Sequence, residues 1–208
     1  MVTHTRHPLT SALLFVATAT ACNAAAGDRQ RLEQVYDDAG KLQLLRYDAD
    51  GDGAIDTWSY MDGARIVRIE IDSDENGTID RWEYYTADQQ IEKIGSSRAR
   101  DGNVDTWTYF GPDGSIARLE FSAKRDGTVN RTEYYDQGTL NRAEEDTDGD
   151  TRIDKWETYE RGRLASVAFD TRQRGTPDRR LVYEAAGNVR LEVAAGGDGQ
   201  WVPAKPVR

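Results

Sequence analysis

Four aspartates crowd into nine residues of the segment YDADGDGAIDTWSY, at Asp48, Asp50, Asp52 and Asp56, with Gly53 among them. Carboxylates at this spacing repel one another, so a loop that holds them together needs a positive charge to neutralise it. Alternating aspartate oxygens around a tight turn are common ligands of a hard divalent cation. The spacing therefore predicts a metal-binding loop directly before a strand.

Two further segments repeat this pattern. Side-chain oxygens fall at positions one, three, five and nine of each loop, and the backbone carbonyl of position seven completes the set. Glycine makes the sharp turn at position six without strain; Thr151 stands there in loop five, where Gly149 is expected to take up part of the turn. The predicted ligands are Asp48, Asp50, Asp52, Ala54 and Asp56 in loop one; Asp72, Asp74, Asn76, Thr78 and Asp80 in loop two; and Asp146, Asp148, Asp150, Arg152 and Asp154 in loop five.

These three loops resemble the calcium loop of EF-hand proteins, and more closely the variant found between β-strands in integrin-type propellers. The resemblance implies Ca²⁺ at up to three sites. An oxygen-only ligand set agrees with calcium, because both histidines and the single cysteine precede residue 23. Position twelve of a strand-flanked loop points away from position nine, so Glu83 and Glu157 are not expected to be ligands, although they stand where an EF-hand has its glutamate.

The other three loops have lost acids and gained bases. We infer that these bases supply internally the positive charge that calcium supplies elsewhere, so that these loops keep their shape without metal. The bases are Arg98 and Arg100 in loop three, Lys124 and Arg125 in loop four, and Arg172 and Arg174 in loop six.

The loops recur every 24 or 25 residues, six times in all, and such a period indicates a repeat protein. Between loops, alternating segments such as IDTWSY and RIVRIEI flank a Gly/Asp turn, which predicts a β-hairpin per repeat. A helical interpretation fails because about fifteen residues, broken by a turn, leave no room for two helices. The sequence predicts an all-β, repeat-built antiparallel meander of about a dozen strands, open and twisted or partly closed into a barrel, with the acidic loops along one rim.

The alternation places tryptophans and tyrosines of successive repeats on one face. Charged residues at Arg68, Glu70, Arg81, Glu83, Lys155 and Glu157 predict that the second face is wet. Two interpretations of the aromatic face remain: a ladder for stacking against a ligand, or a core face buried by curling of the sheet or by a partner. The ladder residues are Trp58, Trp82, Trp107 and Trp156.

The hairpins also resemble YD/RHS-type repeats. VYDDAGKL is the nearest copy, and TYFGPDGSI and VYEAAGNV are weaker ones. YD repeats build long β-sheets in secreted shells and surface proteins, so the resemblance implies a similar sheet here.

The N-terminal region resembles the export signal of a bacterial lipoprotein. Arg6 precedes a short apolar run, and ATAC places small residues before the single cysteine, Cys22. Asn23 is not the aspartate of the inner-membrane retention signal, so the resemblance implies an outer-membrane lipid anchor on Cys22. The alternative is cleavage after the alanines at 24–26, which gives a soluble periplasmic or secreted protein. The expected organisation is a signal peptide at 1–21, a linker at 22–34, the repeat domain at 35–195 and a tail at 196–208.

Charge and composition restrict the function. The formal charge is −10, which disfavours binding to nucleic acid. Repeated carboxylates indicate structure rather than one catalytic constellation, and no G-x-S-x-G nucleophile motif is present. We expect a non-catalytic calcium-binding protein of the cell envelope, structural, adhesive or scaffolding, with an envelope protein as a candidate partner; the alternative is a carbohydrate-binding module that uses the aromatic ladder to bind polysaccharide.

Overall fold

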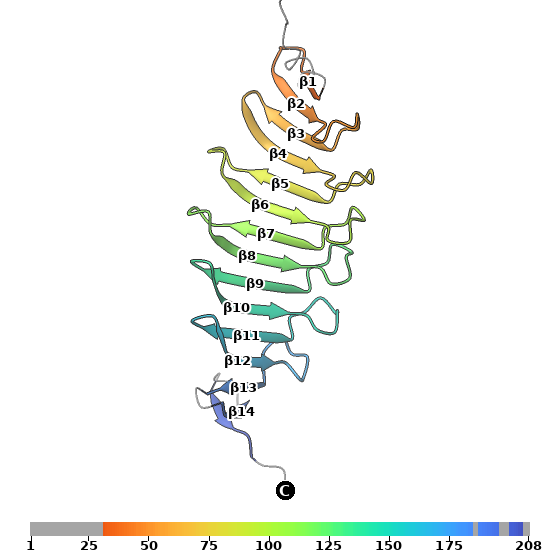
Figure 1. Cartoon of the computed structure of the whole chain (residues 1–208). Helices are drawn as coiled ribbons and strands as arrows, with labels where there is room; N and C mark the ends of the chain where they lie inside the picture. Colours follow the sequence, from red (N-terminus) through yellow and green to blue (C-terminus); the bar gives the residue numbers. More distant parts are fainter. Residues whose placement is uncertain (1–30, 185–186, 196–199, 206–208) are drawn as a thin grey trace, which may run out of the picture. The chain divides into compact units, whose positions relative to one another are not determined.

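A computed structural model describes residues 31–184, 187–195 and 200–205. Fifteen strands form one antiparallel sheet (Figure 1), and no helix that could span a membrane lies in this part of the chain. The strands are β1 (Leu32–Tyr36), β2 (Leu42–Tyr47), β3 (Thr57–Asp62), β4 (Arg65–Ile71), β5 (Arg81–Tyr85), β6 (Ile91–Ser96), β7 (Thr106–Phe110), β8 (Ile116–Phe121), β9 (Arg131–Asp136), β10 (Thr139–Glu145), β11 (Lys155–Glu160), β12 (Arg163–Phe169), β13 (Arg179–Tyr183), β14 (Val189–Ala194) and β15 (Trp201–Pro203).

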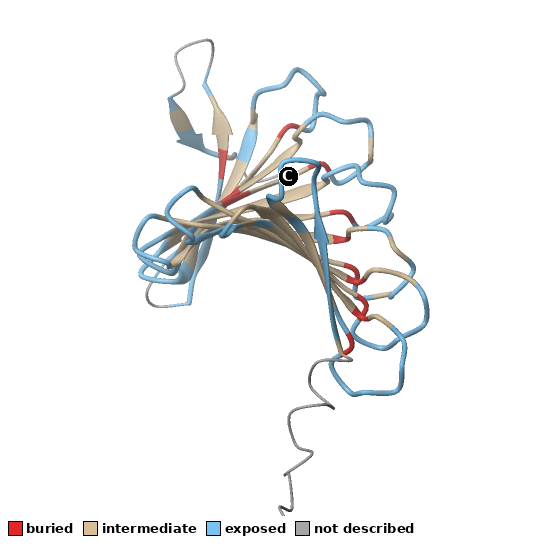
Figure 2. Ribbon diagram, turned by 90° about the horizontal axis from the view of Figure 1, so that it is seen from above, coloured by how far each residue is buried: buried red, intermediate tan, exposed pale blue. Residues whose placement is uncertain are grey.

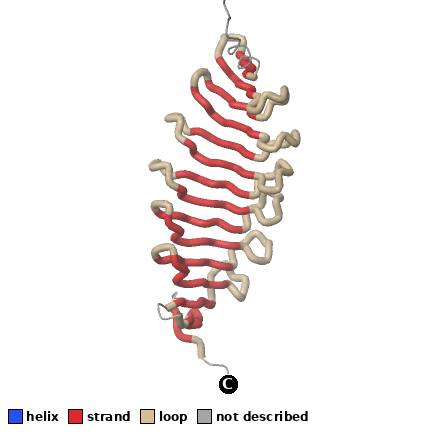
Figure 3. The backbone as a smooth tube through the Cα atoms, in the orientation of Figure 1, coloured by secondary structure: helices blue, strands red, loops and turns tan. Residues whose placement is uncertain are grey.

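The strand order in the sheet is the order in the chain. Each strand pairs with its sequence neighbours, and β1 and β15 are the two edges, so the sheet is open and the barrel alternative is wrong. Short hairpin turns lie along one edge of the sheet, and the six longer loops, acidic and basic, lie along the other (Figure 3). The all-β meander is thus confirmed, with fifteen strands rather than about a dozen.

The boundaries of the sheet differ from the predicted ones at both ends. β1 begins at Leu32, three residues before the predicted start of the repeat domain. The predicted tail contributes β15, which pairs with β14. The predicted signal peptide and Cys22 lie outside the described residues.

The sheet has hardly any apolar core. Only Ala143 and Val167 are buried hydrophobic residues in the described ranges, and no large side chain there is completely buried. The buried positions instead gather where strands pass into the acidic loops (Figure 2). Cross-strand contacts between neighbouring side chains must therefore stabilise most of this single layer.

One face of the sheet, which we call the tyrosine face, carries two rows of residues across successive strands. One row contains Tyr60, Arg68, Tyr84, Lys93, Tyr109, Arg118, Tyr134 and Arg142; the other contains Trp58, Glu70, Trp82, Gly95, Trp107, Glu120, Thr132, Glu144 and Trp156. Tyr60 pairs with Arg68 and Trp58 with Glu70. The predicted placement of Arg68 and Glu70 away from the aromatic side chains is therefore wrong.

The opposite face carries aliphatic residues and a second charged group. Ile69 and Ile71 lie on it beside Arg81 and Glu83. Arg131 from β9 contacts three glutamates there, Glu133, Glu145 and Glu157, at 2.8 to 3.0 Å. Charged and apolar residues thus occupy both faces, and neither is covered by a second layer in the described chain.

Candidate metal centre

All six loops share one backbone arrangement. In each, the backbone N–H of position two donates to the side chain of position nine, the residue directly before the next strand. In loop one this is Ala49 N to Asp56 Oδ2 at 2.6 Å, and in loop four the acceptor is the amide of Asn130. Position nine is therefore part of the loop framework whether or not the loop carries a full set of acids.

Position one closes the loop from the other end. Asp48 is only 6% exposed, and its two oxygens accept the N–H groups of Gly51 and Gly53. Asp146 does the same for Gly149 and Thr151. Each carboxylate oxygen has a second lone pair that these bonds leave free. The backbone thus holds two carboxylates of each acidic loop in place.

Positions four and six have positive φ in every loop. Glycine supplies position six in five loops, but Thr151 adopts φ 71° in loop five. Gly149, at position four, also has positive φ, as position four does in the other loops. Gly149 therefore does not relieve position six, and a β-branched residue is left in a disfavoured conformation.

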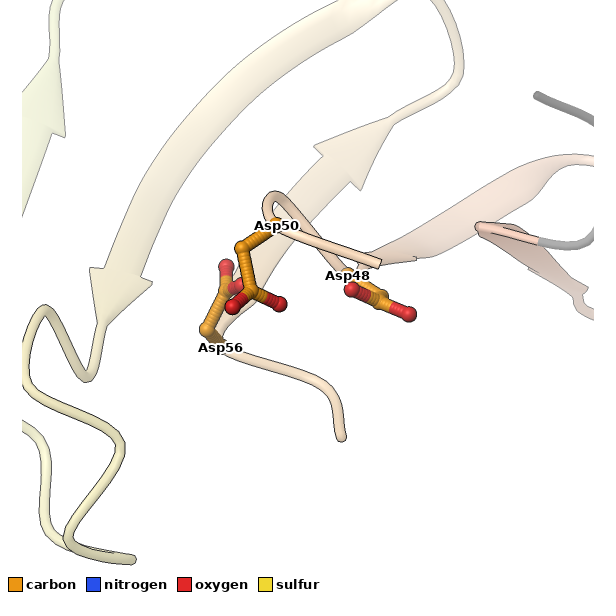
Figure 4. Close-up of side chains that lie close together, drawn as sticks. All are labelled: Asp48, Asp50 and Asp56. Carbon is orange, nitrogen blue, oxygen red and sulfur yellow. The ribbon is translucent and has the colours of Figure 1, made fainter. Parts of the chain in front are cut away.

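Carboxylates converge in the three loops predicted to bind metal. In each, one oxygen from positions one, three and nine lies within 4.8 Å of the others. Figure 4 shows this group in loop one. The groups are Asp48, Asp50 and Asp56; Asp72, Asp74 and Asp80; and Asp146, Asp148 and Asp154. These clusters can hold a metal ion, and the described residues offer it oxygen ligands alone, since they contain neither His nor Cys.

The residues of position five lie differently. Asp52 and Asp150 each accept the N–H of the residue two positions later, Ala54 and Arg152. Neither belongs to the carboxylate group of its own positions one and nine. Asn76 donates its amide N–H to the carbonyl of Arg100 at 3.1 Å. Among the predicted ligands, position five is thus the most peripheral; the carbonyls of position seven remain predictions.

A fourth acidic group joins loops one and two. Oxygens of Asp50, Asp52 and Glu75 lie within 4.8 Å of one another, and all three residues are exposed. Repulsion from Asp50, together with partial loss of solvent and the charge of Asp52, raises the pKa of Glu75. Glu75 is not among the predicted ligands, although its place at position four of loop two sets it beside the neighbouring loop.

Loops three, four and six, which have lost acids and gained bases, are called the basic loops. In two of them a guanidinium group lies beside the position-nine carboxylate, where the acidic loops have further carboxylates. Arg98 Nε lies 3.2 Å from Asp105 in loop three, and Arg172 Nε lies 3.0 Å from Asp178 in loop six. Both partners are the position-nine carboxylates. Loop four differs, because its position nine is the uncharged Asn130. Within their own loop, one predicted base thus neutralises position nine in loops three and six. Arg100 instead contacts Asp74 of loop two, and no ion pair of Lys124, Arg125 or Arg174 is found among the described residues.

Neighbouring loops also contact one another. Arg100 of loop three lies 3.0 Å from Asp74 of loop two, and Gln173 of loop six donates to Asp148 of loop five at 3.3 Å. Position three of these two acidic loops is therefore held partly by the next loop along the edge.

The two glutamates at position twelve lie on the sheet. Glu83 pairs with Arg81 and accepts a hydrogen bond from Tyr85. Glu157 contacts Arg131 and Lys155. Burial disfavours the charge of Glu157, but hydrogen bonds from these bases and from Tyr159 outweigh it and lower its pKa to about 2. This arrangement agrees with the prediction that neither glutamate is a metal ligand.

The four predicted ladder tryptophans, Trp58, Trp82, Trp107 and Trp156, all lie half-buried in one row of the tyrosine face. No second layer of the described chain covers them, so curling of the sheet does not bury them as a core. Cationic side chains lie over the neighbouring rings instead, such as Arg68 over Tyr60 at 4.1 Å and Arg118 over Tyr109 at 3.9 Å.

Other buried positions of the loops were not predicted as functional. Ser97, Ser122 and Asp170 occupy position one of the basic loops and are 3 to 7% exposed. Asp170 accepts the N–H of Gly175 at 2.6 Å. The repeat spacing could have predicted their burial, because it places them at the same loop position as Asp48.

Comparison with known proteins gives no family for this chain. No family model matches it, and no curated protein does. Among solved structures, the crystal structure of accessory secretory protein 1, 2 and 3 in Streptococcus pneumoniae matches 62% of this chain at 14% identity, with a TM-score of 0.21. The crystal structure of TcdB2-TccC3-Cdc42 matches 84% at 12% identity, with a TM-score of 0.22. This chain spans 19% and 11% of those chains.

Proposed function

We propose that loops one, two and five bind calcium and that the bound ions stabilise the loop edge of the sheet. The observation that carries this proposal is the contrast among loops of one framework. Where the position-nine carboxylate has a guanidinium beside it, as Asp105 and Asp178 do, the loop has few acids. Where other carboxylates converge on it, as at Asp56, Asp80 and Asp154, no ion pair of the described residues reaches it, and Arg100 offsets only part of the charge of the loop-two cluster, at Asp74. The charge that remains favours a cation from solution.

Calcium fits these loops better than other common divalent ions. Carboxylate and carbonyl oxygens are its preferred ligands, and its flexible coordination tolerates a loop whose fifth position lies apart. Soft metals would need His or Cys, which the loops lack. Extracellular sites of this kind bind calcium with a Kd of about 10⁻⁴–10⁻³ M, which suits a structural ion outside the cell.

Isothermal titration of the full chain with calcium tests this proposal. We expect three sites. Asp→Asn changes at position three (Asp50, Asp74, Asp148) should each remove one site, because they take charge from the cluster and keep an amide oxygen for the local hydrogen bonds. Asp126→Asn in loop four is the matched control and should leave the count at three. Equal loss in the control, or no binding by the unaltered chain, would contradict the proposal.

We also propose a cellular role, which is supported by the sequence. A repeated, non-catalytic sheet with calcium at its edge suits a structural, adhesive or scaffolding protein of the cell envelope. The lipobox-like ATAC segment supports export and an outer-membrane lipid anchor at Cys22. Incorporation of labelled palmitate into the unaltered chain, and its loss in Cys22→Ser, would support the anchor; a soluble, unlabelled product would contradict it.

A further inference from the structure

One cation of the tyrosine face, Lys93, departs from the pairing of bases with carboxylates that its neighbours show. β4, β8 and β10 each carry an arginine followed two residues later by a glutamate that pairs with it: Arg68 with Glu70, Arg118 with Glu120, and Arg142 with Glu144. β6 has Lys93 and Gly95 at the corresponding positions. Among the described residues, the Lys93 ammonium therefore has no carboxylate partner.

Aromatic rings surround this lysine. Its ammonium lies 4.7 Å from the ring centre of Tyr84, 4.5 Å from that of Trp107 and 5.9 Å from that of Tyr109. Gly95 makes room for this arrangement, because a Cβ there would lie 2.8 Å from the Trp107 ring. Ring faces attract the ammonium but carry no net charge. The site thus has an unneutralised positive charge within a half-buried aromatic surface.

The rest of the tyrosine face allows an anion to approach. Between the acidic-loop edge and the hairpin bulges it carries seven cations, Arg46, Arg68, Lys93, Arg118, Arg142, Arg180 and Arg190, and five carboxylates, Glu33, Glu70, Glu120, Glu144 and Glu192. Beyond the bulges, toward the hairpin turns, Asp62, Asp136 and Glu160 continue the same face, with Arg65 and Arg163 opposite two of them. The chain as a whole has a charge of −10. The excess of acid must therefore lie elsewhere, and much of it is in the loops at the sheet edge.

We propose that this site binds a carboxylate-bearing sugar of an extended acidic polysaccharide. The sugar carboxylate would pair with Lys93, and the apolar faces of the pyranose rings would stack on the exposed parts of the neighbouring aromatic side chains. Arginines lie over the rings of Tyr60, Tyr109 and Tyr134. The stacking positions are therefore the tryptophans, and Trp58 and Trp82 lie on alternate strands, roughly 9.5 Å apart, so a polymer meets them in succession beside Lys93. A short acidic peptide offers the charge but has no ring faces that use this repetition.

Titration of the full chain with polygalacturonate, monitored by tryptophan fluorescence, tests the proposal. EGTA is present throughout, so that calcium cannot bridge uronates to the acidic loops and the result is independent of the calcium proposal. Lys93→Met should weaken binding about tenfold or more, the loss expected for a hydrogen bond to a charged group, and Lys93→Arg should retain most of it. Arg179→Met is the charge-matched control: Arg179 is exposed on the opposite face and its loss should change nothing.

Outcomes of three kinds would overturn the inference. The first is no binding of polygalacturonate by a chain whose thermal unfolding shows it to be folded. The second is equal binding of neutral dextran, or binding indifferent to Lys93→Met, because the carboxylate–lysine pair would then play no part. The third is equally tight binding of polyglutamate, which would make charge alone the determinant and exclude recognition of a sugar.

Discussion

At the residue scale, the loop aspartates have two separate tasks. Those at positions one and nine accept backbone N–H groups and so shape the loop, as Asp48 and Asp56 do. Those at position three, such as Asp50, accept one exposed N–H, that of position five, and add negative charge to the cluster. Mutations at position nine and at position three should therefore distinguish residues that shape the loop from residues that mainly supply charge for an ion.

Under EGTA, Asp56→Ala should lower the free energy of unfolding by about 1–3 kcal/mol, because it leaves the N–H of Ala49 and the hydroxyl of Thr57 without their acceptor. Asp50→Ala should have a smaller effect under EGTA, because the exposed N–H of Asp52 that it frees can bind water and repulsion between carboxylates is removed. Urea unfolding of both variants measures the difference. Equal destabilisation by the two changes would show that position nine has no special structural role.

Thr151 offers a second test at this scale. Thr151→Gly should stabilise the chain by about 1 kcal/mol, because the left-handed conformation at φ 71° costs a β-branched residue more than it costs glycine. The reciprocal change in loop four, Gly127→Thr, should destabilise it by a similar amount; a Cβ at Gly127 meets no atom within 4 Å, so its cost arises from φ alone. Thermal unfolding of both variants checks this. No change in either would contradict the conformational argument.

At the element scale, the hairpin shows why the strands can be predicted from the sequence and why the face of some side chains cannot. The period of 24 or 25 residues and the alternation of segments such as IDTWSY suffice to predict strands, turns and loop edge. Face assignment fails at Arg68 and Glu70 because a bulge between Tyr60 and Met61 shifts the hairpin register by one residue. A shift of one residue moves every side chain of the second strand to the opposite face, and the alternation of the sequence does not predict where a bulge occurs.

The same limit applies to the site. Spacing predicts which aspartates share a loop, and positions one, three and nine do converge. It does not predict contacts between loops, because these depend on how strongly the sheet twists at each repeat. The pairs of Arg100 with Asp74 and of Glu75 with Asp50 and Asp52 are of this kind.

The charged network on the opposite face gives a prediction for pH dependence. The pKa of Glu157 is lowered to about 2 from 4.5, so its ion pairs contribute stability above pH 4.5 that is lost as pH falls toward about 2. Glu157→Gln should reduce stability at pH 7 by about 2 kcal/mol and should flatten the loss of stability across that interval. Glu160→Gln, at the exposed end of the same strand, is the control. Identical acid profiles for the unaltered chain and Glu157→Gln would contradict this assignment.

At the scale of the whole repeat array, a single layer must be stable without a core. Neighbouring strands contribute through cross-strand pairs, and the sheet faces carry nearly balanced charge. The carboxylates in excess lie along the loop edge, where three clusters repeat at the register of the hairpins. Bound cations would remove repulsion along this edge, so calcium should contribute to the stability of the array as a whole rather than to a single loop.

Thermal unfolding of the full chain in calcium and in EGTA measures whether bound calcium stabilises the array. With a Kd of about 10⁻⁴–10⁻³ M, about 10 mM calcium should add roughly 1.4–2.7 kcal/mol per occupied site. We expect a higher melting temperature in calcium, with a smaller shift in each position-three variant and the full shift in Asp126→Asn. Identical melting of the unaltered chain in calcium and in EGTA would contradict it.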